Sequence, residues 1–369
     1  MPSVAIPAAA LAHARETTRA LHSLGLDADA EELLCGRAAM LGLRGGGRTS
    51  AGGATRLMRA RDGWCALTLS RPDDIDAVPA LVECDHVDDP WDAVECRVRA
   101  CDVASFAARA RLLGLPVGVL GETAPAAPVI RPAGEGARPT ALADALVVDL
   151  SSMWAGPLCG ALLARAGATV VKVESAARPD GTRSGATGFF DWINGEKLCY
   201  EVDLDRPEQL RRLLAAADVV IESSRPAALR RRGLGPLDGA ARAGRVWLRI
   251  TGHGTVGERA DWVAFGDDAA VSGGLVSGAA DAPVFCGDAI ADPLTGLHAA
   301  EAVMESRIRG GGEVVEMSMA AVAAGYAHLP RGDDIVCTAV PSVRRHASAP
   351  GADNAAVDRM VAHRQPAAC

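Results

Sequence analysis

The sequence predicts an α/β protein in which a Rossmann-like large domain carries a doubly wound parallel sheet and a smaller domain is α+β. Three observations lead to this prediction. A βαβ unit occupies residues 145–174, and two further apolar runs at 218–222 and 246–251 each end in small or polar residues. A separate hairpin pattern near residue 60 predicts the smaller domain.

The βαβ unit begins with the apolar, β-branched run 146–150, which is typical of a buried strand. A loop of mostly small side chains, 151–155, comes next, and Gly156 and Pro157 then open a helix. The second strand lies at 169–173. Because ligands of parallel sheets bind at the carboxyl ends of the strands, we expect the loop 151–155 to border a binding site.

The region before this unit predicts a compact α+β module. Two amphipathic helices fit residues 6–42, and a glycine-rich loop at 45–53 leads to a hairpin that turns at Asp62 and Gly63. A helical region ending in a short strand then occupies residues 71–120. Composition favours a flexible linker for the glycine-rich loop, and a mobile backbone cradle stays open.

The chain of 369 residues is long enough for two domains. Four segments are expected, which are a small α+β domain with N-terminal helices (1–122), a stiff exposed linker rich in proline and glycine (123–140), the large domain (141–330) and a C-terminal tail (331–369).

Composition excludes several classes of protein. A formal net charge of −8, with Lys172 and Lys197 as the only lysines, argues against nucleic acid as a partner. The basic run 230–232 is either a solvated helix end or a handle for a small anion. No G-x-G-x-x-G fingerprint follows the first strand of the βαβ unit, which disfavours NAD and FAD.

Ten cysteines occur without a C-x-x-C pair or a His/Cys cluster, so we expect reduced thiols and no metal. The first thirty residues lack the apolar core of a signal peptide, and no apolar run is long enough to span a membrane. A cytoplasmic protein without a membrane partner is therefore expected.

Asp292 is the first candidate for chemistry. It precedes Pro293 at the start of an apolar helix, where the spacing favours a structural N-cap. The same place would keep a carboxylate ionised and directed outward, as a nucleophile requires. Asp288, four residues earlier, is its rival.

Other polar residues have ordinary explanations. Asp267 and Asp268 could form a metal pair, and a solvated turn is favoured. His298 fits a packed core histidine better than a base. His253 lies in a Gly-His-Gly loop after a strand, a better location for chemistry, although solvation of the loop is the default.

A series of motifs in a fixed order carries a resemblance, at residues 147–157, 167–174, 180–183, 203–208, 217–222, 252–254 and 291–298. This series resembles the large domain of the class III CoA-transferases, a family that also includes 2-methylacyl-CoA racemases. Residues 52–122 are similar to the family's small domain, which normally follows the large one, and 351–357 resemble its closing segment. The domain order is therefore expected to be permuted.

The resemblance implies an enzyme that moves CoA from an acyl-CoA to a small carboxylic acid. Asp292 would be the nucleophile, forming an aspartyl anhydride and then an aspartyl-CoA thioester, with no permanently bound cofactor. Gly52 and Gly53 would form an oxyanion loop, and a homodimer is implied. The positions implied to contact CoA are Trp154, Ala155, Arg183, Val202, Asp203, Ser223, Ser224, Arg225 and Arg231.

Several positions depart from the family pattern. Trp154 replaces a frequent glutamine, and Ser175 and Asp205 replace basic residues, which leaves mainly arginines to bind the CoA phosphates. The racemase His-Asp pair is unmatched, because residues 264–268 read Ala-Phe-Gly-Asp-Asp. An acyl-CoA racemase or lyase is therefore the second hypothesis, and a catalytically degenerate acyl-CoA-binding paralogue is the third.

Overall fold

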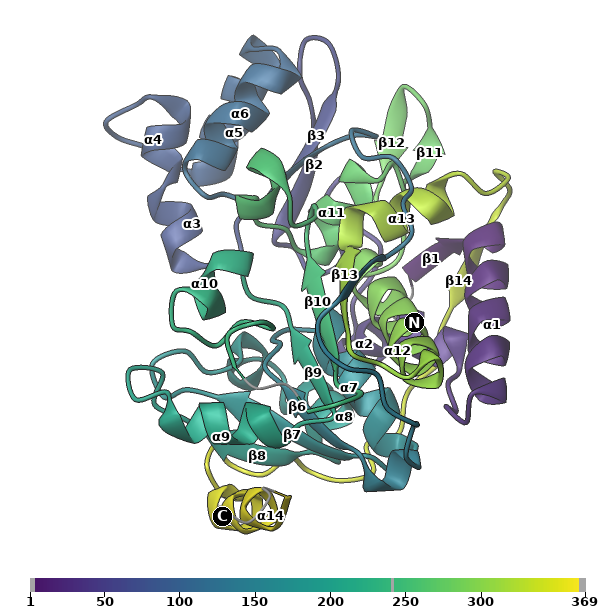
Figure 1. Ribbon diagram of the computed structural model, residues 1–369. Coiled ribbons are helices and arrows are strands. Elements are labelled where there is room, and N and C mark those ends of the chain that lie inside the picture. The colour runs from purple at the N-terminus through teal and green to yellow at the C-terminus, as the bar shows by residue number, and fades with distance from the viewer. Residues whose placement is uncertain (1–3, 240–241, 365–369) are drawn as a thin grey trace.

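A computed structural model describes residues 4–239 and 242–364. Its centre is a seven-stranded sheet in the order β5-β13-β10-β9-β6-β7-β8, parallel except for β5 (Figure 1). The predicted α/β class is thereby confirmed. The strands are β5 (Val129–Pro132), β6 (Leu146–Asp149), β7 (Thr169–Glu174), β8 (Leu198–Glu201), β9 (Val219–Glu222), β10 (Val246–Thr251) and β13 (Glu313–Ser318).

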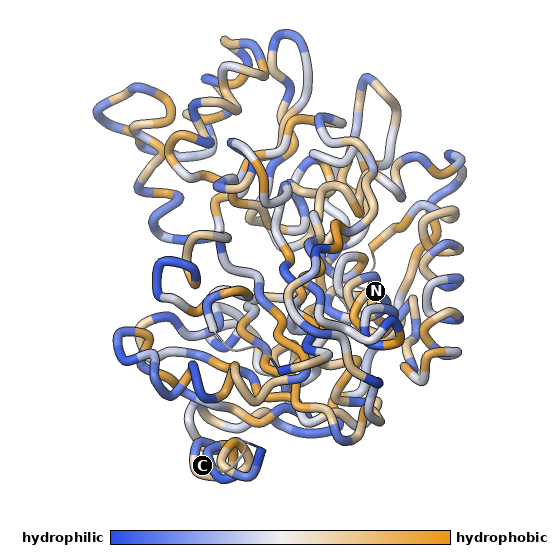
Figure 2. Tube along the Cα trace, viewed as in Figure 1, coloured by the Kyte–Doolittle hydropathy of each residue, from blue (hydrophilic) through white to orange (hydrophobic). Residues whose placement is uncertain are grey.

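Helices cover both faces of this sheet, as doubly wound topology requires. On one face, α7 (Ala155–Arg165) packs closely against α12 (Ala291–Arg309), which also contacts α13 (Met319–Ala327). The other face is covered by α9 (Glu208–Ala216) and α14 (Asn354–Arg364). Figure 2 shows hydrophobic residues along the central strands and hydrophilic stretches in the outer loops.

The smaller sheet, β2-β3-β4, contains the predicted hairpin. The helices α3 to α6 build its separate core, which includes Val78, Val98 and Phe106. A helix from later in the chain, α11 (Gly266–Ser272), also packs against β3 and β4. The elements are β2 (Thr55–Arg59), β3 (Trp64–Thr68), β4 (Val117–Val119), α3 (Pro72–Asp76), α4 (Val78–Val82), α5 (Pro90–Ala100) and α6 (Val103–Leu112).

The N-terminal helices contact the large sheet's helical layer. Helix α1 (Ala8–Ser23) packs against α12 and α13, and α2 (Ala30–Leu41) packs against α12 and α8 (Thr187–Asn194). Two short strands that the sequence did not predict, β1 (Val4–Pro7) and β14 (Asp334–Cys337), pair antiparallel beside them. Helices α1 and α2 thus pack on the core of the large sheet. The division of the chain into domains stays a proposal.

One expectation needs correction. A disulfide joins Cys35 and Cys337, so the prediction of reduced thiols is wrong for this pair, while seven other cysteines in the described residues are free. Two cysteines that lie far apart in the sequence leave no local pattern from which their disulfide could be predicted. The segment 123–140 is exposed over much of its length, and β5 within it adds an antiparallel edge strand to β13.

The remaining elements connect these layers. They are α10 (Pro226–Arg230), the hairpin strands β11 (Ser277–Ala279) and β12 (Ala282–Val284), and the 3₁₀ helices at Leu142–Asp144, Gly181–Ser184 and Gly257–Asp261. None of the helices in the described part of the chain has the length and apolarity that a bilayer crossing requires.

Candidate active site

The direction in which the chain adds strands to the sheet reverses between β6 and β9. From β6 the chain moves outward to β7 and β8, and it then returns to β9, on the other side of β6. Such a reversal opens a crevice at the carboxyl ends of the two strands. The loops after them meet there, because Ser152 donates its backbone N–H to Ser223 Oγ at 3.2 Å.

The loop after β6 is held by buried ion pairs. Lys172 Nζ lies 2.6 Å from Asp180 Oδ2, and that carboxylate accepts the backbone N–H of Met153 at 3.2 Å. Met153 has a φ of 73°, a conformation that non-glycine residues rarely adopt and that costs roughly 1–3 kcal/mol. The surrounding contacts thus impose a strained turn directly before Trp154 and Ala155.

Asp292 lies in the first turn of α12, next to the end of the loop that follows β6. Ile290 is the N-cap of that helix, and no side chain caps it, so the N-cap interpretation of Asp292 is wrong. The carboxylate instead faces the backbone N–H groups of Gly266 and Ala155, which lower its pKa. A Cβ on Gly266 would lie 2.4 Å from Asp292 Oδ2, so only glycine permits this approach.

Burial raises the pKa of Asp292 to about 7, and the nearby charge of Asp267 acts in the same direction. Arg37 opposes both effects and lowers that pKa. Near neutral pH the group therefore divides between a carboxylic acid and a carboxylate that is more basic, and hence more nucleophilic, than an exposed aspartate.

Arg37, on α2, is a site residue that sequence reasoning missed. Its Nη1 lies 2.5 Å from Oδ1 of Asp288, whose side chain is only 1% exposed. The guanidinium carbon lies 5.6 Å from the Trp154 ring centre and 5.5 Å from that of Phe189. A Cβ on Gly52 would lie 3.6 Å from Arg37 Nη2, so the glycine-rich loop reaches the same place.

Asp267 and Asp268 do not form the solvated turn that the sequence favoured. Both belong to the first turn of α11, and Asp268 is fully buried. Burial, together with the charge of Asp288, raises the pKa of Asp267 to about 6, and burial raises that of Asp268 to about 8. The cause is the packing of α11 against the small sheet, where Thr68 Oγ1 donates to Asp268 Oδ1 at 2.7 Å.

Two of the buried polar atoms that have no hydrogen-bond partner among the described residues lie next to Arg37. They are Trp154 Nε1, a donor, and Asp288 Oδ2, an acceptor. Buried polar groups are nearly always paired in folded proteins, with protein, water or a ligand. The indole N–H beside Arg37 is therefore a donor without an acceptor in the described part of the fold.

The positions implied to contact CoA follow the carboxyl ends of neighbouring strands. Arg183 is engaged internally, since its guanidinium donates hydrogen bonds to both oxygens of Glu174 and lies over the Phe190 ring. Val202 is buried, whereas Asp203 is exposed. The others lie after β6 (Trp154, Ala155) and after β9 (Ser223, Ser224, Arg225, Arg231), with Arg225 exposed at the N-cap of α10.

His253 is buried, where a solvated loop was expected, and His298 is hydrogen-bonded on the wall of a cavity, where a packed core histidine was expected. His253 is 5% exposed, burial lowers its pKa to about 4, and it packs edge-on against Trp262. His298 shares hydrogen bonds with Glu301 and Tyr326 and lines a cavity of about 400 Å³ with His13. Within 4–239 and 242–364, no three His, Cys, Asp or Glu side chains are grouped to hold a metal ion.

A doubly wound α/β sheet with a helix-borne carboxylate, two backbone donors and an arginine at its carboxyl edge is suited to covalent chemistry on an activated carbonyl group. Residues 142–351 match the family described as CoA-transferase family III. Because this segment is more than half of the chain, the chain belongs to that family, as its motifs predicted.

The alignments with individual relatives cover a smaller part of the chain than the family match does. The succinyl-CoA–D-citramalate CoA-transferase of Chloroflexus aurantiacus is 32% identical over 199 residues, 49% of this chain and 50% of the relative. The succinate–glutarate CoA-transferase of Agrobacterium fabrum is 32% identical, over 47% of this chain and 49% of the relative. A crystal structure of a CAIB/BAIF family protein from Brucella suis has a TM-score of 0.46 at 29% identity, covering 51% of this chain and 55% of that chain. The chain spans about half the length of the curated relatives it matches.

Proposed function

We propose that this protein transfers coenzyme A from an acyl-CoA donor to a small carboxylic acid, with Asp292 as the nucleophile. The observation that supports this most directly is the setting of Asp292, a carboxyl group between two backbone N–H groups with a pKa of about 7. CoA is then a substrate and not a resident cofactor.

In the first half-reaction, an oxygen of Asp292 attacks the thioester carbonyl carbon, and the C–S bond breaks to release the CoA thiolate. This gives a mixed anhydride. The thiolate attacks the Asp292 carbonyl of that anhydride, which forms the aspartyl-CoA thioester and releases the donor acid. The acceptor carboxylate reverses the sequence, leaving as a new acyl-CoA and restoring Asp292.

The neighbouring groups fit these steps. The N–H groups of Gly266 and Ala155 orient the attacking carboxylate. We assign the carboxylate of the acceptor to Trp154 Nε1 and the positive charge of Arg37, because the first is an unpaired donor and the second lies next to it. Gly52 and Gly53 remain the proposed source of N–H groups for the oxyanion, supported by the proximity of Gly52 to Arg37.

The test is covalent capture. The purified protein is incubated with a panel of acyl-CoAs and examined by intact mass and peptide mapping. We expect a hydroxylamine-sensitive adduct on the peptide that contains Asp292, and none in Asp292→Asn. Asp281→Asn, on the exposed turn between β11 and β12, is the control and should still form the adduct. An adduct on another residue, or none with any donor, contradicts the mechanism.

One observation favours a second reaction, acyl-CoA racemisation or a related elimination. The charge of Asp267 raises the pKa of Asp292, and the two pKa values are about 6 and about 7, so one carboxyl group can act as an acid while the other acts as a base near neutral pH. Exchange of the α-proton of a 2-methylacyl-CoA for deuterium, without an acceptor acid, would identify this reaction.

A degenerate acyl-CoA-binding protein is the third candidate. It is favoured by the loss of free positive charge, since both lysines and Arg183 are held in ion pairs within the fold. Acyl-CoA binding without any covalent adduct would identify it. We also propose a homodimer, on the resemblance to the family alone, and light scattering of the purified protein would test it.

A further inference from the structure

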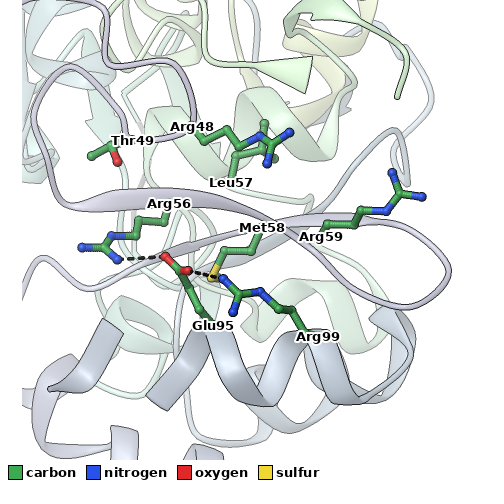
Figure 3. A pocket seen from close by; sticks show the side chains of 8 residues that line it. All are labelled: Arg48, Thr49, Arg56, Leu57, Met58, Arg59, Glu95 and Arg99. Carbon is green, nitrogen blue, oxygen red and sulfur yellow. Dashed lines mark hydrogen bonds and ion pairs between the residues drawn. The ribbon is translucent and has the colours of Figure 1, made fainter. Parts of the chain in front are cut away.

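A second pocket, separate from the Asp292 crevice, lies on the smaller sheet. It has a volume of about 160 Å³ and follows β2, an edge strand of that sheet. Figure 3 shows arginine side chains around that edge, with Arg48 on one side of the strand and Arg99 on the other. The residues that line the pocket are Arg48, Thr49, Arg56, Leu57, Met58, Arg59, Glu95 and Arg99.

The charge of this pocket contrasts with that of the whole chain. Four arginines and one glutamate line it, whereas the protein as a whole has a formal charge of −8. Glu95 lies 2.9 Å from Arg56 and 2.8 Å from Arg99. Among the residues that the structure describes, no carboxylate lies within ion-pair distance of Arg48 or Arg59, so the lining keeps an uncompensated positive charge.

Aromatic rings hold these guanidinium groups in place. The guanidinium carbons of Arg48 and Arg59 lie 4.6 and 5.7 Å from the centre of the Trp64 ring. That of Arg56 lies 4.7 Å from the Trp91 ring. A guanidinium over a ring face keeps its in-plane N–H groups free for an anion, and less conformational entropy is lost when the anion binds.

We propose that this pocket binds the phosphate groups of a small phosphorylated molecule. Arginine pairs with phosphate through two parallel N–H···O bonds, and several arginines with one counter-ion suit a multiply charged group better than a single carboxylate. The volume accommodates a phosphate or diphosphate, while the organic part of the molecule would project into solvent. The phosphates could come from CoA itself, an option that rests on the proposed function, or from a separate phosphorylated metabolite.

The pocket is also joined to the Asp292 site by one short segment of chain. Thr49 lines the pocket, and the next residue, Ser50, bonds the carboxyl group of Asp267. Gly52 of the same loop lies against Arg37. An anion bound at Arg48 would therefore hold the loop that borders the candidate nucleophile.

Calorimetric titration with inorganic pyrophosphate tests the proposal. We expect the wild-type protein to bind it, with affinity that falls as NaCl screens the charges. The double variant Arg48→Ser, Arg59→Ser should bind at least tenfold more weakly. Arg97→Ser is the matched control, because Arg97 lies on the same helix as Arg99 and pairs with Glu83 outside the pocket. It should bind as the wild type does.

Arg99→Ser provides a second variant, since this side chain is 70% exposed and its loss should leave the fold intact. It should also weaken pyrophosphate binding, at an unchanged melting temperature. Equal affinity in wild type and both pocket variants, or no binding by the wild type, overturns the proposal.

Two further measurements distinguish the sources of the phosphate. If CoA supplies it, the double variant raises KM for acyl-CoA but not for the matching acyl-pantetheine. If a separate molecule supplies it, CoA binding is unchanged while pyrophosphate binding is lost. The failure of the proposed function would appear differently, as absence of an Asp292 adduct in a protein that still binds pyrophosphate.

Discussion

Nη1 of Arg37 lies 2.5 Å from Oδ1 of Asp288, and the two residues are 251 positions apart in the chain. Arg37 belongs to the N-terminal helices, outside the segment that matches the family, while Asp288 lies within it. The N-terminal part of the chain thus contributes a positive charge to a site whose carboxylates belong to the family segment. Arg37 lowers the pKa of each of the aspartates 267, 288 and 292, against the larger effect of their burial.

Replacing Arg37 with glutamine should move the activity to higher pH. Arg37 lowers the pKa of Asp292, so without it the carboxylate ionises only at a higher pH. The acid limb of the kcat/KM profile should shift upward, and Arg37→Lys should restore much of it. An unshifted profile in Arg37→Gln would mean that Arg37 has no electrostatic effect on the nucleophile.

The same substitution also tests the ion pair. Asp288 is 1% exposed and loses its partner, while Arg37 itself is 24% exposed, so the cost is at most the roughly 3–5 kcal/mol of breaking a fully buried pair from one side. We expect Arg37→Gln to lower the free energy of unfolding and the double variant Arg37→Gln, Asp288→Asn to recover most of the loss. Chemical denaturation measures both, and additive losses would contradict the pairing.

Asp292→Asn should abolish transfer without unfolding the protein. The asparagine oxygen can still accept the N–H groups of Gly266 and Ala155, and the position does not cap its helix, so the fold keeps its contacts. For the wild type, kcat/KM should rise with pH through about 7, as the nucleophile ionises. A variant that retains turnover would transfer the nucleophilic role to Asp267 or Asp288.

Local patterns predicted the strands well. The runs 146–150 and 169–173 form β6 and β7 within one residue at each end, because buried parallel strands need continuous β-branched sequence. Asp62 and Gly63 likewise lie in the turn of a real hairpin. These features depend on neighbours in the chain, which a single sequence displays.

The remaining features depend on contacts between distant segments. Nothing near Arg37 indicates that it meets Asp288, and strand β1 has only four residues, paired with β14 at the other end of the chain. Asp268 resembles a turn residue until α11 is packed on the small sheet. Asp292 was identified by its motif, while its N–H partners are the first residues of two other helices, α7 and α11.

Asp268 should make the protein less stable as the pH rises. Its pKa is about 8 in the folded protein and about 4 when unfolded. Asp268 therefore contributes its full stabilisation of the folded state below about pH 4. This contribution is lost as the pH rises through 8, and the free energy of unfolding falls by an amount on the order of several kcal/mol. Asp267 and Asp292 act with the same sign.

Asp268→Asn removes this ionisation. Its melting temperature should fall less between pH 5 and pH 9 than that of the wild type, as measured by calorimetry. Asp281→Asn, on an exposed turn, should behave as the wild type does. A constant difference in melting temperature between Asp268→Asn and wild type across this range would contradict the raised pKa.

Reduction of the Cys35–Cys337 disulfide should lower the melting temperature. The bond closes a loop between residues 302 positions apart, and loss of such a bond costs about 2–5 kcal/mol in small domains. Treatment with dithiothreitol should reproduce the effect of Cys337→Ser, and dithiothreitol should not destabilise that variant further. An identical melting temperature with and without reductant would show that the two thiols are not joined.

Gly266→Ala tests the geometry around the candidate nucleophile most directly. The added Cβ would lie 2.3 Å from the carbonyl oxygen of Ala289 and 2.4 Å from Asp292 Oδ2, closer than real Cβ contacts. Because the obstacles are a backbone oxygen and the reacting carboxylate, α11 must shift, at a cost of about 1–3 kcal/mol. We expect at least a tenfold loss of kcat, with a smaller change in KM. Gly332→Ala, where no atom lies within 4 Å of the new Cβ, is the matched control and should retain full activity. Normal turnover by Gly266→Ala would mean that the approach of this backbone N–H to Asp292 contributes nothing to the reaction.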